Sequence, residues 1–156
     1  AFYEQPGVQI RIQAIPGDMF IPSVYFGFDN QGYGDYTGRY EIRSKGLYCQ
    51  IAQTLGFGGV EVIPAAGCNY CLESDEGFDI FGGVEFVFGG SGSLLADYAL
   101  NLNDPTDMNK GYLNVGLRLL FYGEMYFEFS LRDLLGNHAS DQQFNRCIKM
   151  GFEQSF

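Results

Sequence analysis

Apolar and polar residues alternate along long stretches of this chain, which is the pattern of β-strands with two different faces. Residues 112–122 show it most clearly, because every second residue there is large and apolar. Residues 125–131 and 144–156 repeat the pattern, with charged residues in the opposite phase. The apolar phase of these three segments comprises Leu113, Val115, Leu117, Leu119, Phe121, Met125, Phe127, Phe129, Leu131, Ile148, Met150, Phe152 and Phe156. We predict three consecutive strands, each apolar on one side and polar on the other.

The N-terminal two thirds of the chain repeat this alternation less regularly. Further strands are predicted at 8–15, 20–29, 42–53, 57–64, 78–88 and 93–102. The segment 42–53 is the weakest, since neither of its phases is consistently apolar. The 22 Gly, 15 Phe and 11 Tyr agree with strands and turns rather than helices. The chain is therefore expected to be all-β, with about nine strands in a single domain over residues 1–156.

Short and long connections alternate between these strands. The short ones are "IPGDM", "QTLG", "FGGSGS" and "YGE"; the long, polar ones are "DNQGYGDYTGR", "AAGCNYCLESDEG", "NLNDPTDMNK" and "LLGNHASDQQ". Such alternation is typical of outer-membrane barrels. We therefore expect a small antiparallel up-and-down transmembrane β-barrel of eight to ten strands. Because single-chain bacterial barrels have even strand numbers, nine candidates leave a choice. Residues 1–19 are either part of the barrel or a segment outside eight strands.

The polar phase carries charges of both signs, which suits ion pairs inside a barrel. Its charged residues include Arg11, Glu85, Asp97, Arg118, Glu128, Arg132, Lys149 and Glu153. An Arg or Lys turned towards lipid near the bilayer midplane would cost about 2–4 kcal/mol, so the polar phase is assigned to the lumen. The predicted lumen charge network consists of Arg118, Glu124, Glu128, Arg132, Lys149 and Glu153. Glu124 and Glu128 are also of the residue type that glycosidases use as paired catalytic acids, but the facing arginines favour ion pairs.

Composition narrows the classes of partner. The net charge of -10, with only nine Lys and Arg, argues against nucleic acid. No run of about 18 apolar residues exists, which excludes a transmembrane helix. The chain begins at Ala1 without a signal peptide, and we expect that one has been removed or was never carried.

Four cysteines allow three pairings. Cys68 and Cys71, in "CNYC", are the candidate disulfide. A structural zinc site usually needs a second closely spaced pair, which is missing here, so no metal and no cofactor is predicted.

Catalytic chemistry receives little support. His138 lies near Ser140 and Asp141 in "GNHASDQQ", but neighbours in one loop rarely form a preorganised triad. Tyr33, Tyr36 and Tyr70 are assigned to loops, where ordinary packing is favoured over stacking on sugar rings. We therefore expect no enzymatic activity.

Two resemblances follow from these residues. Ile148, Met150, Phe152 and the terminal Phe156 resemble the C-terminal signal that the barrel-assembly machinery reads in bacterial outer-membrane barrels; Gln154 departs from it. Residues 22–48, 110–121 and 127–137 resemble the C-terminal part of YjbH-like outer-membrane proteins. That resemblance implies an outer-membrane location and a role linked to exopolysaccharide, with lipid, other envelope subunits or polysaccharide as partners.

The expected function is a non-enzymatic, structural or envelope-assembly role in the bacterial outer membrane. Alternation alone fits a soluble sheet equally well, since a half-buried soluble strand has the same period. A secreted soluble β-protein that self-associates or binds carbohydrate is therefore the alternative. An outer-membrane hydrolase is the third hypothesis.

Overall fold

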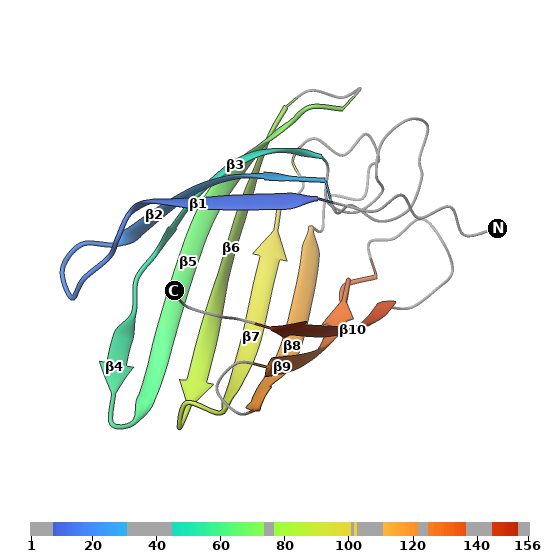
Figure 1. Cartoon of the computed structure of the whole chain (residues 1–156). Coiled ribbons are helices and arrows are strands. Elements are labelled where there is room, and N and C mark those ends of the chain that lie inside the picture. The colour runs from blue at the N-terminus through green and yellow to red at the C-terminus, as the bar shows by residue number, and fades with distance from the viewer. Residues whose placement is uncertain are drawn as a thin grey trace.

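The computed structural model describes residues 8–30, 45–73, 77–100, 102, 111–121, 125–136 and 145–152, which form one antiparallel β-sheet without a helix (Figure 1). The strands are β1 (Gln9–Ile15), β2 (Ser23–Asp29), β3 (Gly46–Ala52), β4 (Leu55–Phe57), β5 (Val60–Cys71), β6 (Gly77–Phe88), β7 (Gly92–Ala99), β8 (Tyr112–Phe121), β9 (Met125–Arg132) and β10 (Asn145–Phe152). The expected all-β antiparallel fold is confirmed. Gln9–Ile15 belongs to the sheet and does not lie outside it.

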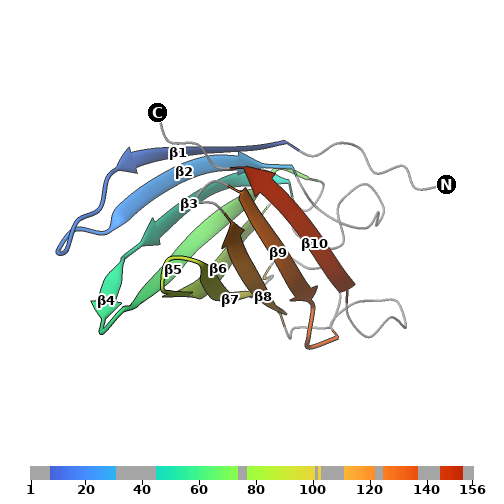
Figure 2. The ribbon, with the colours of Figure 1, turned by 60° about the horizontal axis from the view of Figure 1, so that its bottom comes forward.

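The strands follow one another across the sheet in chain order, β1-β2-β3-β5-β6-β7-β8-β9-β10, and the short β4 pairs with β5. β1 pairs only with β2 and β10 only with β9, so the described sheet is open and the expected closure is not present. Figure 2 shows a strongly curved sheet with β1 and β10 at its two edges. Because each step along the path is antiparallel, nine strands leave β1 and β10 running in the same direction. They therefore cannot close the sheet by another antiparallel pair.

Two tight hairpins turn on glycine pairs with positive φ. Gly58 and Gly59 have φ of 55° and 90°, and Gly89 and Gly90 have φ of 56° and 70°. Two successive positive φ values give the type I′ geometry, whose twist matches that of the flanking strands. The turn predicted at "QTLG" is therefore misplaced, since the chain resumes as β4 after Gln53 and Thr54 and reverses only at Gly58–Gly59.

The strand predicted at 57–64 extends to Cys71, so "AAGCNYC" is strand and not loop. Ala and Gly are poor strand formers, but β5 lies between β3 and β6 and pairs with both along this stretch. Tertiary pairing overrides the local signal there. Tyr70 is consequently not a loop residue: its ring packs against Phe78 of β6, with the ring centroids 5.0 Å apart.

Cross-strand partners share a face, so the register fixes the two faces of the whole sheet. One row runs through Ile12, Phe26, Cys49, Cys68 and Ile80. This face is apolar and exposed throughout. Its exposed large side chains are Ile10, Ile12, Phe26, Leu47, Ile51, Phe78, Ile80, Phe86, Phe88, Leu94, Leu117, Leu119, Phe121, Met125, Phe129, Ile148 and Met150.

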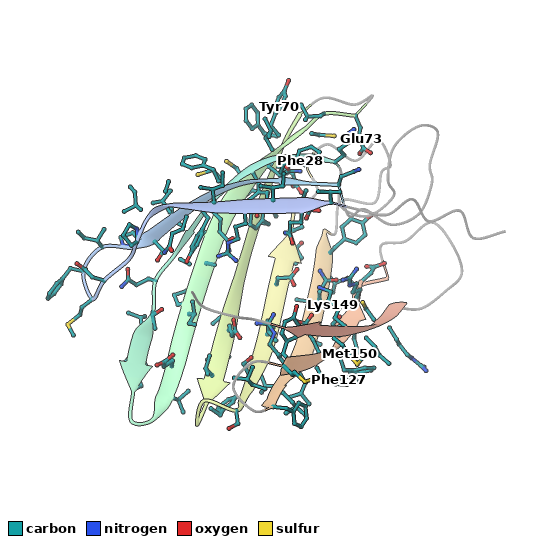
Figure 3. All side chains as sticks on the ribbon, in the orientation of Figure 1. Phe28, Tyr70, Glu73, Phe127, Lys149 and Met150 are labelled. Carbon is teal, nitrogen blue, oxygen red and sulfur yellow. The ribbon has the colours of Figure 1, made fainter. Side chains whose placement is uncertain are left out.

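The opposite face is polar, and its side chains bury one another. The buried polar residues on it include Asp79, Ser93, Glu128 and Ser130. A face whose residues are crowded while those of the other face are exposed is the concave face of the curved sheet. In Figure 3, Lys149 and Met150, adjacent on β10, lie on opposite sides of their strand. The predicted division into an apolar and a charged face therefore holds across all the strands.

Aromatic rings on the concave face lie directly against glycines of the neighbouring strand. Tyr126 faces Gly151, and Phe81 faces Gly67, in each case as direct cross-strand partners. A Cβ added at either glycine would collide with the facing ring. The same relation links Tyr48 to Gly27. Glycine thus makes room for a ring on the crowded side of the sheet, a known way of filling curved sheets.

Candidate functional site on the concave face

Glu128 of β9 is the centre of a charge cluster on the concave face. Only 7% of the residue is exposed. Its Oε2 accepts hydrogen bonds from Arg118 Nη2 at 2.8 Å and from Arg118 Nε at 3.1 Å. Lys149 Nζ lies 3.5 Å from Oε1. Arg118 and Lys149 are the direct cross-strand partners of Glu128 on β8 and β10, so the strand register itself builds this triad.

Arg118 extends the cluster to a fourth strand. Its Nη1 donates to Glu85 Oε1 of β6 at 3.4 Å, across the intervening β7. Its guanidinium carbon also lies 5.3 Å from the centroid of the Tyr126 ring. The cluster of Glu85, Arg118, Glu128 and Lys149, called here the four-strand cluster, contains two acids and two bases. Its formal charges therefore cancel, and it links β6, β8, β9 and β10 through side chains.

The sequence prediction and the structure overlap in part at this cluster. Arg118, Glu128 and Lys149 are brought together. Arg132 lies on the same face at the end of β9, next to the connection that follows it. Glu124 and Glu153 lie outside the described residues. Glu85 is not predicted as a member because it lies two strands away; its only sequence signal is its shared phase.

A second polar row lies nearer the long connections. Asn114 Nδ2 of β8 donates to Asp97 Oδ2 of β7 at 2.7 Å, and Asn114 Oδ1 accepts from the backbone N–H of Asp133 at 2.9 Å. Asp133 is 2% exposed and has a φ of 53°, a conformation that Asp tolerates better than most residues. Asp79 Oδ1 accepts from the N–H groups of Ile80 and Leu102. These contacts fix the strand ends where the long connections begin.

The concave face also carries a cation on the opposite edge of the sheet. The guanidinium carbon of Arg11 in β1 lies 3.8 Å from the centroid of the Tyr25 ring in β2, a close cation–π contact. Sequence reasoning identifies Arg11 as a polar-face residue, but its aromatic partner depends on the register of β1 against β2. That register places Arg11 opposite Gly27 and leaves the neighbouring Tyr25 free to lie under the guanidinium.

The candidate disulfide between Cys68 and Cys71 is not formed. All four cysteines are free thiols. Residues three apart on a strand point to opposite faces, which places Cys68 on the exposed convex face and Cys71, 0% exposed, on the concave face. The cross-strand partner of Cys68 is Cys49 of β3.

Metal binding and catalysis have no assembled site among the described residues. No group of three or more His, Cys, Asp and Glu side chains in residues 8–152 with the stated gaps could hold a metal ion. His138, Ser140 and Asp141 lie outside the described residues, as do Tyr33 and Tyr36. The part of the chain that is described contains no helix long and apolar enough to cross a membrane.

The residues that resemble an assembly signal lie at the last edge of the sheet. Ile148 and Met150 are on the convex side of β10 and are 64% and 80% exposed. Phe152 ends the strand, and Phe156 lies outside the described residues. Comparison of the chain with protein-family models, curated proteins and solved structures finds no match.

Proposed function

We propose that the protein is a non-enzymatic outer-membrane β-barrel whose convex face contacts lipid and whose charged concave face forms a filled lumen. The observation that carries this proposal is the inverted burial of the sheet. The buried hydrophobic residues in the described part are Cys71 and Tyr112 alone, whereas the buried polar residues include Asp79, Glu128 and Asp133. A water-soluble sheet buries its apolar face and exposes its charges.

The size of the exposed apolar surface supports the same conclusion. Soluble monomers rarely expose contiguous apolar patches of more than a few hundred Å². Here the convex face is apolar from β1 to β10, with Phe26, Phe78 and Met150 each more than half exposed. Lipid covers such a surface completely and needs no complementary shape. An outer-membrane protein of this kind would be inserted by the barrel-assembly machinery.

The role that fits this arrangement is structural. Every charge of the four-strand cluster faces an opposite charge, so the cluster holds strands in register. Side chains fill the interior of small barrels, which favours an envelope component over a diffusion pore. The link to surface polysaccharide rests on the YjbH-like resemblance and stays a prediction.

Closure is the feature that the barrel proposal adds to the sheet. In hydrocarbon, the unpaired N–H and C=O groups of an open edge are strongly unfavourable. β1 and β10 run in the same direction, so the chain closes either with one parallel pair or with an added strand antiparallel to both. The alternative function, a soluble β-protein that self-associates, would cover the convex face with further copies instead.

Detergent dependence and gel migration test the proposal. The chain is extracted from membranes and compared with and without a mild detergent, and its migration in a denaturing gel is compared before and after boiling. We expect solubility only with detergent and a boiling-dependent shift in migration. A monodisperse, detergent-free monomer with unchanged migration would refute a membrane barrel, and detergent-free oligomers would support the self-associating alternative.

A further inference from the structure

The turn between β1 and β2, Pro16–Pro22, presents a compact apolar tip. Met19 is 79% exposed, Phe20 87% and Ile21 52%. Phe20 is the most exposed large apolar side chain in the described structure. The tip continues the apolar face of the hairpin through Ile15, which is 46% exposed. An ordinary water-facing turn would carry polar side chains at these positions.

The N–H groups of this turn are satisfied within the turn itself. Asp18 Oδ1 accepts from the N–H groups of Phe20 and Ile21 at 2.7 and 2.8 Å. The Asp18 N–H donates to the Ile21 carbonyl at 2.8 Å, and the Gly17 N–H donates to Ser23 Oγ at 3.0 Å. Pro16 and Pro22 have no N–H. The single charged side chain of the turn is thus used to bind backbone donors.

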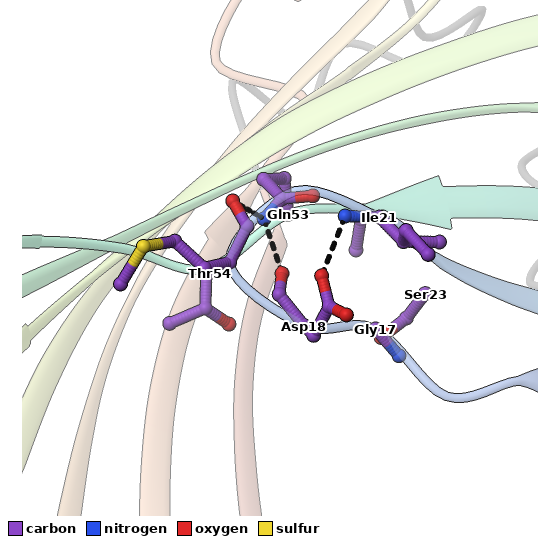
Figure 4. A pocket seen from close by; sticks show the side chains of 8 residues that line it. Gly17, Asp18, Ile21, Ser23, Gln53 and Thr54 are labelled. Atoms are coloured by element: carbon purple, nitrogen blue, oxygen red, sulfur yellow. Dashed lines mark hydrogen bonds between the residues drawn. The ribbon is translucent and has the colours of Figure 1, made fainter.

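Two carbonyl groups of the turn are bound by a residue from another part of the sheet. Gln53, in the break between β3 and β4, donates from Nε2 to the Asp18 carbonyl at 2.8 Å and to the Met19 carbonyl at 3.4 Å. Figure 4 shows Gln53 and Asp18 across the small hollow that they line, whose volume is about 180 Å³. Gln53 therefore fixes the turn against the sheet and leaves the side chains of Met19 and Phe20 pointing outwards.

The strand lengths give the tip a geometric role. A membrane-spanning β-strand needs about 9–11 residues. β1 and β2 have 7 residues each, whereas β5 and β6 in the middle of the sheet have 12. The apolar surface of the first hairpin reaches the length of the central strands only if Ile15–Ile21 is included.

We propose that the Pro16–Pro22 turn inserts into the boundary between lipid headgroups and acyl chains, with Phe20 and Met19 as its lipid contacts. This inference rests on the proposed membrane location of the sheet. Backbone groups that are paired internally are an advantage where water is scarce. Aromatic side chains concentrate at membrane interfaces, where barrels carry aromatic girdles. The turn thus extends a short hairpin to the membrane surface.

The chain contains no Trp, so a single introduced Trp reports on one position. Three variants are compared in vesicles of phosphatidylcholine and phosphatidylglycerol: Phe20→Trp at the tip, Leu117→Trp in the middle of the convex face, and Tyr25→Trp on the concave face of the same hairpin. Each is exposed to lipids brominated close to the headgroup or deep in the acyl chain, and to acrylamide in the water.

For Phe20→Trp we expect blue-shifted emission, strongest quenching by the shallow bromines, and acrylamide quenching several-fold weaker than in the urea-unfolded chain. Leu117→Trp should be quenched most by the deep bromines and Tyr25→Trp least by either lipid. If Leu117→Trp is quenched by lipid but Phe20→Trp only by acrylamide, the turn lies in water and the inference is wrong while the membrane location stands. If neither Trp is quenched by lipid, the proposed function fails as well.

An additional variant tests whether the fixed turn matters. Gln53→Leu removes the donor to the Asp18 and Met19 carbonyls without touching Phe20. In the Phe20→Trp background it should raise acrylamide quenching several-fold, because the freed carbonyls draw water to the turn. Unchanged quenching of Phe20→Trp would contradict the role given to Gln53, and a lipid-bound partner protein at the tip would show as quenching that changes when purified chain replaces membranes.

Discussion

Arg118 of β8 and Glu128 of β9 face each other as direct cross-strand partners, and the guanidinium donates two hydrogen bonds to one carboxylate oxygen. Lys149 approaches the other oxygen from the opposite strand. This arrangement makes Glu128 the residue on which the four-strand cluster depends, because its removal leaves two cations facing each other without an acid between them.

Glu128→Ala should therefore destabilise the sheet more than the loss of either cation. Breaking a buried ion pair costs about 3–5 kcal/mol, and an exposed pair contributes about 0–1 kcal/mol. Arg118 is partly exposed, with 35% of its side chain accessible, so we expect a loss of about 1–3 kcal/mol in urea unfolding in detergent. Glu61→Gln, an exposed acid on the same face, should change stability by less than about 0.5 kcal/mol. Equal effects of the two variants would contradict the cluster.

Gly67→Ala should destabilise the sheet because the new Cβ would meet the Phe81 ring and the Cys49 carbonyl oxygen. Backbone cannot move as cheaply as a flexible side chain, and overpacking costs about 1–3 kcal/mol. Gly56→Ala is the matched control: nothing lies within 4 Å of its added Cβ. That variant should be neutral or more stable by up to about 1 kcal/mol, since Gly is entropically unfavourable in strands. Chemical denaturation of both variants, in the same detergent, distinguishes them.

Asp18 should retain its charge at unusually low pH. The N–H groups of Phe20 and Ile21 bind its carboxylate and hold its pKa below the ordinary value. A folded pKa below the unfolded one means that the turn is stabilised at pH above about 4 and loses this contribution as the pH falls through the folded pKa. The carboxyl resonance of Asp18 should titrate below about pH 3.9 in the folded chain and near 3.9 in urea. Equal midpoints would show that the cap is absent, and Asp18→Asn should remove the acid-dependent step.

The cysteines should all be reduced, with unequal reactivity. Cys68 lies exposed on the convex face and Cys71 is fully buried. We expect an apolar maleimide to modify Cys68 far faster than Cys71, and the intact mass to show four thiols. Cleavage after Glu61 and Tyr70 separates Cys49, Cys68 and Cys71, so mass spectrometry of the unreduced digest reveals any link. A Cys68–Cys71 bond would contradict the strand geometry, whereas added oxidant should link Cys68 to its partner Cys49.

Alternation in the sequence was sufficient to predict the two faces, and it failed where single residues carry the information. The segments 78–88 and 112–122 have one consistently apolar phase, and their faces are as predicted. The β5 residues Ala65, Ala66 and Gly67 have no strand signal of their own. They are held by β3 and β6 on either side, and no local pattern contains that pairing.

The charge cluster was partly predictable for the same reason. Phase alone places Arg118, Glu128 and Lys149 on one face, but contact requires the register between strands. That register follows from the hairpin between β8 and β9, and from the alignment of β10 after a long connection. The Gln53 contact to the Pro16–Pro22 turn depends on a break between β3 and β4 that the sequence places at a turn instead.

The most direct test of the account is the environment of successive residues along one strand. Spin labels at Cys introduced for Gly116, Leu117, Leu119 and Leu120 of β8, in a chain without native cysteines, are measured in lipid vesicles for collision with oxygen and with a water-soluble nickel complex. We predict high oxygen accessibility at 117 and 119, and low oxygen accessibility at 116 and 120, with a period of two. Accessibility to the nickel complex at 117 and 119, or an inverted phase, would contradict a convex face that contacts lipid.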